Sequence, residues 1–167
     1  ASGIPFLEGL VKNRYVGRTF IKPSQNQREI GVALKLNVLE EVVRGKSIVL
    51  VDDSIVRGTT IKRLISRLRA CGAGKIHLRI SAPPVMWPCF FGIDTPSRDE
   101  LLGARFSVEE IGRLVGADSI GYLSLEGLIE ATSSSGFCTG CFSGQYPLDI
   151  EGADGRYALD TAQKVRT

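Results

Sequence analysis

The stretch from residue 47 to residue 60 constrains the fold more than any other part of the sequence. It begins with the β-branched apolar run Ser47–Val51, continues through two adjacent acids, Asp52 and Asp53, and reaches Gly58 and two threonines. A continuous apolar run of this length indicates a strand buried on both faces, as in a parallel sheet with helices above and below it. We therefore expect a strand, a short loop and a helix, with both acids at the carboxyl end of the strand.

The neighbouring segments predict a βαβ unit around this strand. Apolar residues at helical spacing predict helices over Glu29–Arg44 and Thr59–Cys71, each followed by glycine. The alternating segment Lys75–Ile80 predicts a half-exposed strand. Strand, helix and strand at this spacing are typical of an α/β fold with a parallel sheet.

The second half of the chain is less regular. Pro83 opens a predicted loop that runs to about Arg98. Ser107–Val115 is a predicted helix, since Ser107 and Glu110 have the spacing of a capping box. A short strand over Ile120–Leu123 and a short helix over Leu125–Ala131 follow. We expect one α/β domain over residues 1–132 and a C-terminal segment over 133–167 that ends in a polar tail.

Composition excludes several classes of protein. The 167 residues are 43% hydrophobic and 23% charged, which rules out a disordered chain, and no apolar run approaches the roughly 20 residues that span a bilayer. A net charge of +3 suits an anionic small molecule and does not by itself argue for nucleic acid. The first residues do not resemble a signal peptide. They also lack an initiator methionine, which suggests a piece of a longer protein.

The loop after the first predicted strand has the features of a sugar-phosphate site. Ligands of open α/β sheets bind at the carboxyl ends of the strands, and a helix N-terminus attracts phosphate. Gly58 allows close backbone approach, and Thr59 and Thr60 add hydroxyl donors. Asp52 and Asp53 suit sugar hydroxyls or Mg²⁺. The alternative is structural: the acids cap the helix and the glycine forms a tight turn. A Walker-type loop is excluded because its motif is absent.

Cysteines and basic residues mark two further regions. Cys71 continues the apolar stripe of its predicted helix, so we expect it to be buried. Cys138 and Cys141 form a C-x-x-C pair that, alone, is ambiguous between redox, zinc and iron–sulfur use. Cys89 is a third candidate metal ligand; His77 is predicted to lie at the surface, so a fourth ligand is expected outside this chain. The basic residues between 12 and 28 indicate, by themselves, a solvated loop.

Four motifs of this chain resemble those of one family, and they follow one another in the same order as in that family. Residues 48–60 resemble the PRPP (phosphoribosylpyrophosphate) motif of type I phosphoribosyltransferases. The sequence of residues 51–60, VDDSIVRGTT, is similar to the corresponding segment of the glutamine PRPP amidotransferase family. Lys12–Ile21 resembles the mobile active-site loop of that family, and Pro88–Asp94 and Phe137–Cys141 resemble two further motifs. The resemblance covers roughly residues 3–150. It implies a type I phosphoribosyltransferase-like parallel sheet flanked by helices, truncated at its N-terminus and without its pyrophosphate loop.

The resemblance also implies roles for particular residues. Asp52 and Asp53 would fix the ribose hydroxyls and assist Mg²⁺, and the residues from Ser54 to Thr60 would hold the 5′-phosphate. The PRPP-binding set is thus Asp52, Asp53, Ser54, Ile55, Val56, Arg57, Gly58, Thr59 and Thr60. Candidate catalytic contacts from the closing flap and the segment after it are Arg14, Tyr15, Arg18 and Lys35. One branch of the family holds a structural [4Fe–4S] cluster, for which Cys89, Cys138 and Cys141 match three ligands, with the fourth upstream.

The implied reaction is transfer of glutamine-derived ammonia to PRPP, giving 5-phosphoribosylamine, pyrophosphate and glutamate at the start of purine synthesis. The N-terminal glutaminase domain of the family has no counterpart here, so we expect little activity from this chain alone. The full-length protein is expected to be a cytoplasmic homo-oligomer subject to feedback by purine nucleotides, without nucleic-acid or membrane partners. The alternatives are a non-enzymatic PRPP or nucleotide sensor on the same fold, and a phosphoribosyltransferase that uses a purine base.

Overall fold

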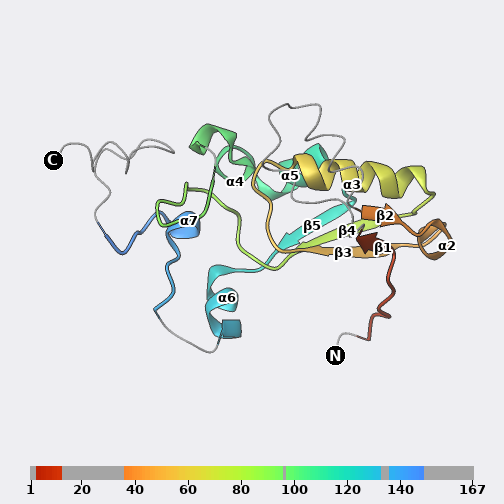
Figure 1. Ribbon diagram of the computed structural model, residues 1–167, viewed down its shortest axis with the longest axis horizontal. Coiled ribbons are helices and arrows are strands. Elements are labelled where there is room, and N and C mark those ends of the chain that lie inside the picture. Colours follow the sequence, from red (N-terminus) through yellow and green to blue (C-terminus); the bar gives the residue numbers. More distant parts are fainter. Residues whose placement is uncertain (1–2, 13–35, 96, 133–135, 149–167) are drawn as a thin grey trace.

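A computed structural model describes residues 3–12, 36–95, 97–132 and 136–148 (Figure 1). Its centre is a three-stranded parallel sheet of β3 (Ile48–Asp52), β4 (Ile76–Ile80) and β5 (Ser119–Tyr122), in the order β3-β4-β5. β3 and β4 pair in register from Ile48 opposite Ile76 to Asp52 opposite Ile80. The predicted α/β class with a parallel sheet and flanking helices is confirmed.

Two amphipathic helices cover one face of this sheet. α3 (Thr59–Ala70) and α5 (Val108–Val115) lie side by side above the strands (Figure 1). α3 buries Ile61, Ile65 and Leu68, which are neighbours on one helix face because they are three or four residues apart. Cys71, at the C-cap of α3, is partly buried against the same core. α5 begins at the predicted capping box of Ser107 and Glu110.

The opposite face of β3 contradicts the prediction from sequence. Val49 is 41% exposed and Val51 is 68% exposed, whereas Leu50 is buried. The prediction of a strand buried on both faces is therefore wrong for the described part of the chain. An apolar pattern indicates that a strand suits a buried position, but the residues that bury its second face must come from another part of the protein. None of the described elements lies over Val49 and Val51.

The segment before β3 also differs from its prediction. The expected helix Glu29–Arg44 is wrong over β2 (Leu36–Val38), which pairs antiparallel with β1 (Leu10–Lys12). Only α2 (Glu40–Val43) is helical there, and residues 29–35 lie outside the described residues. Tertiary contacts explain the difference, because the Leu36 carbonyl accepts a 2.8 Å hydrogen bond from Arg67 of α3. The pairing with β1 satisfies further backbone groups that a helix would have satisfied internally.

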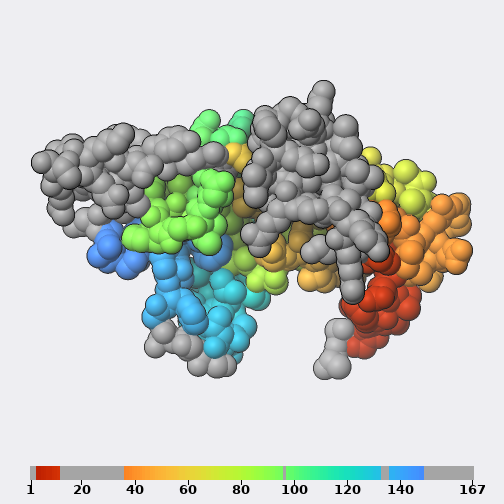
Figure 2. Space-filling model, in the orientation of Figure 1, coloured from red at the N-terminus to blue at the C-terminus, as the bar shows by residue number. Residues whose placement is uncertain are grey.

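The later elements follow the expected order with additions. After β4 a loop leads to η2 (Arg98–Glu100) and α4 (Leu102–Arg105), and β5 is followed by α6 (Leu125–Thr132) and α7 (Gly140–Ser143). Figure 2 shows residues 136–148, in blue, beside the green residues of the β4–η2 loop. This placement agrees with two hydrogen bonds of 3.0 Å, donated by the Met86 and Trp87 amides to the Cys141 carbonyl. No helix in the described ranges has the length and apolar character of a membrane span.

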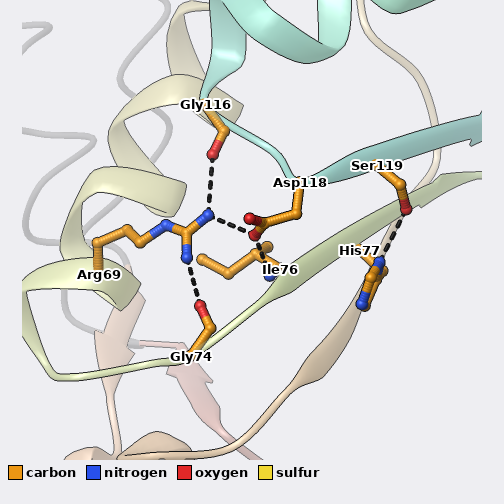
Figure 3. A network of polar contacts seen from close by, with 7 residues as sticks. All are labelled: Arg69, Gly74, Ile76, His77, Gly116, Asp118 and Ser119. Atoms are coloured by element: carbon orange, nitrogen blue, oxygen red, sulfur yellow. Dashed lines mark hydrogen bonds and ion pairs between the residues drawn. The ribbon is translucent and has the colours of Figure 1, made fainter.

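A polar network closes the end of α3 that lies far from the acidic pair (Figure 3). The Arg69 guanidinium donates to the carbonyls of Gly74 and Gly116 and pairs with the Asp118 carboxylate. The same carboxylate accepts a 2.6 Å hydrogen bond from the Ile76 amide. One arginine thus connects the end of α3 to the start of β4 and the start of β5.

Candidate functional site

The two adjacent acids lie at the end of β3, as predicted. They differ in burial and in their hydrogen-bond partners. Asp52 is half-buried, and its Oδ1 accepts a 3.0 Å hydrogen bond from the amide of the exposed Asp53. The Asp53 carboxylate accepts a 3.2 Å hydrogen bond from the Ser54 hydroxyl. The Ser81 amide, just after β4, donates to the Asp52 carbonyl at 3.0 Å. Backbone pairing therefore fixes the end of β3 and leaves the two carboxylates at the edge of the sheet.

Burial makes Asp52 an unusual carboxyl. Its desolvation raises its pKa above the ordinary value of 3.8, the hydrogen bond from the Asp53 amide lowers it, and the negative charge of Asp53 raises it again. The net pKa is raised, so the ionised form is less stable here than in water. A cation or a hydrogen-bond donor beside Asp52 would relieve this unfavourable ionisation.

The N-terminus of α3 is open. Its N-cap is Gly58, in the left-handed region at φ 71°, and no side chain caps the helix. The amides of the first turn therefore have no side-chain acceptor, and the helix dipole makes this end positive. The structural alternative, in which Asp52 and Asp53 cap this helix, is contradicted. Thr59 and Thr60 are exposed beside the same amides.

Gly58 is required for a second reason. A Cβ at this position would lie 2.5 Å from Cδ1 of Leu102 and 3.5 Å from Cγ1 of Val115. The loop is also held by α4, since the Leu102 amide donates to the Val56 carbonyl at 3.0 Å. Ile55, between the acids and the glycine, is buried in the core. The loop is thus fixed from beneath, and its amide side remains open.

These parts line one pocket of about 380 Å³. Every residue predicted to bind PRPP, from Asp52 to Thr60, is among its lining residues. The Arg57 side chain, within this set, forms a 2.8 Å ion pair with Glu100. Two further lining residues were not predicted as part of the site: the buried Ile61 of α3, and Asp94 from the loop after β4. The signal for Asp94 was its place in a loop that leaves the same carboxyl edge of the sheet as Asp52.

The four flap and lysine candidates lie outside the described residues. Arg14, Tyr15, Arg18 and Lys35 belong to residues 13–35, so the pocket is described without them. Their predicted contacts with substrate stay predictions.

The three candidate cluster cysteines gather in one region without forming a finished site. Burial raises the pKa of the Cys141 thiol, and the charges of Cys89 and, to a smaller extent, Cys138 raise it further. The Tyr146 hydroxyl donates to the Pro88 carbonyl at 2.6 Å, and the Tyr146 ring packs edge-on against Phe90. Within the described ranges, no group of three or more His, Cys, Asp or Glu side chains is arranged to hold a metal ion.

Comparison with known proteins agrees with this geometry. Residues 1–82 match the family model of the phosphoribosyl transferase domain. The match includes β3, the acidic pair and the open end of α3. The fold is that of a phosphoribosyltransferase, as shown by the matched domain together with the parallel sheet and the pocket.

Within that class, the relatives of this chain are amidophosphoribosyltransferases. The chain is 54% identical to the enzyme of Archaeoglobus fulgidus over 157 residues, which are 92% of this chain and 34% of that protein. It is 55% identical to the enzyme of Synechococcus elongatus over 152 residues, or 90% of this chain and 31% of that one. The chain thus spans about a third of the length of these curated relatives.

Solved structures give the same result. A glutamine PRPP amidotransferase from Bacillus subtilis, complexed with ADP and GMP, superposes with a TM-score of 0.79 at 48% identity, over 94% of this chain and 36% of that one. An allosteric regulatory enzyme of purine biosynthesis superposes with a TM-score of 0.76 at 50% identity, over 91% of this chain and 34% of that one.

Proposed function

We propose that this chain holds PRPP within an amidophosphoribosyltransferase. In this reaction water hydrolyses glutamine to glutamate and ammonia. The ammonia nitrogen then bonds to C1 of PRPP while the bond from C1 to pyrophosphate breaks, giving 5-phosphoribosylamine. The observation that supports the proposal most is the pocket in which an uncapped helix N-terminus and an acidic pair lie together. The hydrolysis of glutamine is assigned to a part of the protein outside this chain.

The two ends of the pocket suit the two ends of phosphoribose. Amides of the first turn of α3, with the Thr59 and Thr60 hydroxyls, would bind the 5′-phosphate. Asp52 and Asp53 would accept hydrogen bonds from the ribose hydroxyls. Binding both ends fixes C1 relative to the incoming ammonia, so catalysis by this chain is mainly positioning.

Mg²⁺ is part of the proposal, and the donor set fits it. Asp52 and Asp53 offer carboxylate oxygens, which Mg²⁺ prefers as ligands. The raised pKa of Asp52 indicates a carboxylate that a nearby cation would stabilise in its ionised form. When bound, the ion supplies charge stabilisation for the departing pyrophosphate.

The closing segment is proposed from the sequence resemblance. Arg14, Tyr15 and Arg18 would contact PRPP from a flap, and Lys35 would lie near the phosphates. Arginine suits this role because its guanidinium forms paired hydrogen bonds with phosphate. Closure would exclude water, which otherwise attacks the reactive ribosyl centre.

A structural [4Fe–4S] cluster on Cys89, Cys138 and Cys141 is proposed for the whole protein, with its fourth ligand outside this chain. The hydrogen bonds that join residues 86–88 to residues 141–146 support it, because they hold the segments of Cys89 and Cys141 together. We also propose a cytoplasmic location for the full-length protein, since thiols that hold a cluster stay reduced there. An absorbance spectrum of anaerobically purified full-length protein tests the cluster, and a spectrum without iron–sulfur bands would contradict it.

Regulation and assembly are proposed at a coarser level. The Bacillus subtilis neighbour was solved with ADP and GMP. By analogy we infer that purine nucleotides bind the full-length protein and that it assembles as a homo-oligomer. Binding of nucleotides is measured by calorimetry and assembly by analytical ultracentrifugation.

The test of the central proposal is ammonia-dependent release of pyrophosphate from PRPP by the full-length protein with Mg²⁺. Turnover that Asp53→Asn abolishes in a folded protein supports the proposal. Binding of PRPP without turnover would favour the alternative, a PRPP sensor on the same fold. Turnover with a purine base in place of ammonia would favour a base-specific phosphoribosyltransferase.

A further inference from the structure

The segment that forms η2 and α4 contacts three consecutive residues of the loop after β3. The Leu102 amide donates to the Val56 carbonyl at 3.0 Å. Glu100 forms its ion pair with the next residue, Arg57, and the Leu102 side chain fills the space that a Cβ on Gly58 would need. All three loop residues line the pocket. One wall of the pocket is therefore held by a segment that lies far away in the sequence.

The ion pair fixes Arg57 through one side of its guanidinium. The Arg57 Nε donates to Oε2 of Glu100 at 2.8 Å. The other oxygen, Oε1 of Glu100, accepts a 3.3 Å hydrogen bond from the Ser97 hydroxyl, and the Glu100 amide donates to the Ser97 carbonyl at 3.0 Å. The carboxylate is thus held through both of its oxygens. Because the contact uses Nε, the remaining N–H donors of Arg57 belong to its two terminal nitrogens.

The exposure of this pair indicates what it contributes. Both side chains are 44% exposed, and an ion pair at such exposure adds little to folding because water and salt screen it. Its effect on the order of Arg57 is larger. A long side chain loses its rotamer freedom when it binds a ligand, and this loss opposes binding. A guanidinium that is already fixed through Nε has less freedom to lose.

The position of Arg57 suits a phosphate group. Arg57 lines the pocket together with the uncapped N-terminus of α3, whose dipole attracts an anion. Paired N–H groups of a guanidinium match the oxygens of a phosphate. Glu100 carries a negative charge as well, so it has two opposite possible effects on an anion: to orient Arg57 for binding, or to neutralise it. The two effects change the affinity for a phosphate ligand in opposite directions.

We propose that Glu100 is a positioning residue for substrate binding: it fixes Arg57 through Nε, so that the terminal nitrogens of Arg57 bind the 5′-phosphate of PRPP. This inference rests on the proposed function, because it takes the pocket to be the PRPP site. It adds to that function a residue from outside the loop after β3 and names the side chain through which this residue acts.

The test is a double-mutant cycle in the full-length protein. Calorimetry with Mg²⁺, without glutamine or ammonia, measures the Kd of PRPP. Glu100→Ala should raise this Kd about fivefold and Arg57→Met about 30-fold. Because Glu100 acts through Arg57, adding Glu100→Ala to Arg57→Met should cause no further change. An unchanged or lower Kd in Glu100→Ala, or the same increase in both backgrounds, would overturn the proposal.

Kinetics and thermal unfolding distinguish positioning from a structural role. The 5′-phosphate does not react, so its contacts are alike in the ground state and the transition state. Glu100→Ala should therefore raise the KM for PRPP and leave kcat within about twofold of wild type. Its melting temperature should change by less than about 2 °C. A large fall in melting temperature, with kcat reduced as much as the affinity, would show a structural role and overturn the proposal.

A conservative variant keeps the test decisive. Glu100→Gln retains the length of the side chain and an acceptor oxygen but loses the charge, so it should raise the Kd of PRPP by a smaller factor than Glu100→Ala. If Glu100→Ala does not fold, Glu100→Gln takes its place in the cycle with Arg57→Met. An increase in Kd that persists in the Arg57→Met background then overturns the proposal.

Controls separate this inference from the proposed function. Glu40→Ala breaks another exposed ion pair, with Arg44 in α2, which does not line the pocket, and should leave the Kd of PRPP unchanged. Asp53→Asn and Arg57→Met test the PRPP site itself. If neither alters PRPP binding, the pocket is not the PRPP site and the proposed function fails. If both weaken binding and Glu100→Ala does not, the inference about Glu100 fails alone.

Discussion

The two ends of α3 differ in how their backbone groups are satisfied. At the C-terminal end, the amides of Cys71, Gly72 and Ala73 donate to carbonyls of the last turns. Arg69 adds the ion pair with Asp118 (Figure 3). At the N-terminal end, Gly58 offers no capping side chain and the first-turn amides face a pocket. The closed end stabilises the fold, and the open end keeps its donors for a ligand.

The pKa values of the two aspartates reflect this difference. Asp118 at the closed end accepts hydrogen bonds from the Ile76 amide and from Arg69, which lower its pKa. Burial without comparable partners raises the pKa of Asp52 at the open end. The free protein disfavours the ionised form of the Asp52 carboxyl. This carboxyl is therefore suited to bind a cation or hydrogen-bond donor that stabilises its charge.

The largest expected effect comes from Asp52→Asn. Loss of the charge should weaken PRPP binding about 100-fold, since charge-assisted hydrogen bonds contribute about 1.5–3 kcal/mol each. The melting temperature of the unliganded protein should stay equal or rise, because the substitution removes a destabilised carboxylate. Calorimetry and thermal unfolding measure the two quantities. A large fall in melting temperature would show that Asp52 stabilises the fold instead.

Gly58→Ala should have the second largest effect. The methyl group meets Leu102 and the positive φ is strained, so the free energy of unfolding should fall by about 1–3 kcal/mol. The affinity for PRPP should fall as well. Gly45→Ala is the matched control, because Gly45 has the same φ of 71° and its added Cβ would meet nothing within 4 Å. Equal losses in chemical denaturation would mean that the contact with Leu102 contributes nothing.

Arg69→Met tests the closed end. It keeps much of the apolar stem and removes the donors to Gly74, Gly116 and Asp118, so the melting temperature should fall by several degrees. The Kd of PRPP should not change. Arg113→Met, at the exposed last turn of α5, is the control and should change the melting temperature little. A weaker PRPP affinity in Arg69→Met would show that the two ends are coupled.

The smallest expected effect is a difference between the pH values at which Asp52 and Asp118 titrate. Carbon-detected NMR of labelled aspartates should show Asp52 titrating above the ordinary value near 3.8 and Asp118 titrating below it. The stability contributed by Asp118 is present above the unfolded pKa and is lost as the pH falls through its lower folded pKa. The ionised form of Asp52 is lost earlier in the same acid titration. A common midpoint for both carboxyls would contradict the difference between the two ends.

The sequence predicted those elements whose pattern is local. β3, α3, β4 and α5 carry apolar residues at strand or helix spacing, and Ser107 with Glu110 marked the start of α5. The acidic pair and Gly58 were located because their chemistry follows from their position between a strand and a helix.

Elements that depend on a distant partner were not predicted. β1 and β2 are three residues each and pair with each other, so no local period reveals them. Asp94 reaches the pocket from the loop after β4, in which the buried Thr95 accepts a hydrogen bond from the Cys89 amide, and no local pattern reveals either contact. The exposure of Val49 and Val51 depends on what covers the sheet, which the strand itself does not specify.

These two valines affect how the polypeptide behaves in the laboratory. Produced by itself, this sequence would present a β-branched surface on the outer strand of its described sheet, a geometry that templates pairing between copies. Light scattering should grow with protein concentration in such a preparation, and Val51→Thr or Val51→Lys should suppress it. Kinetic and calorimetric work is therefore best done on the longer natural polypeptide.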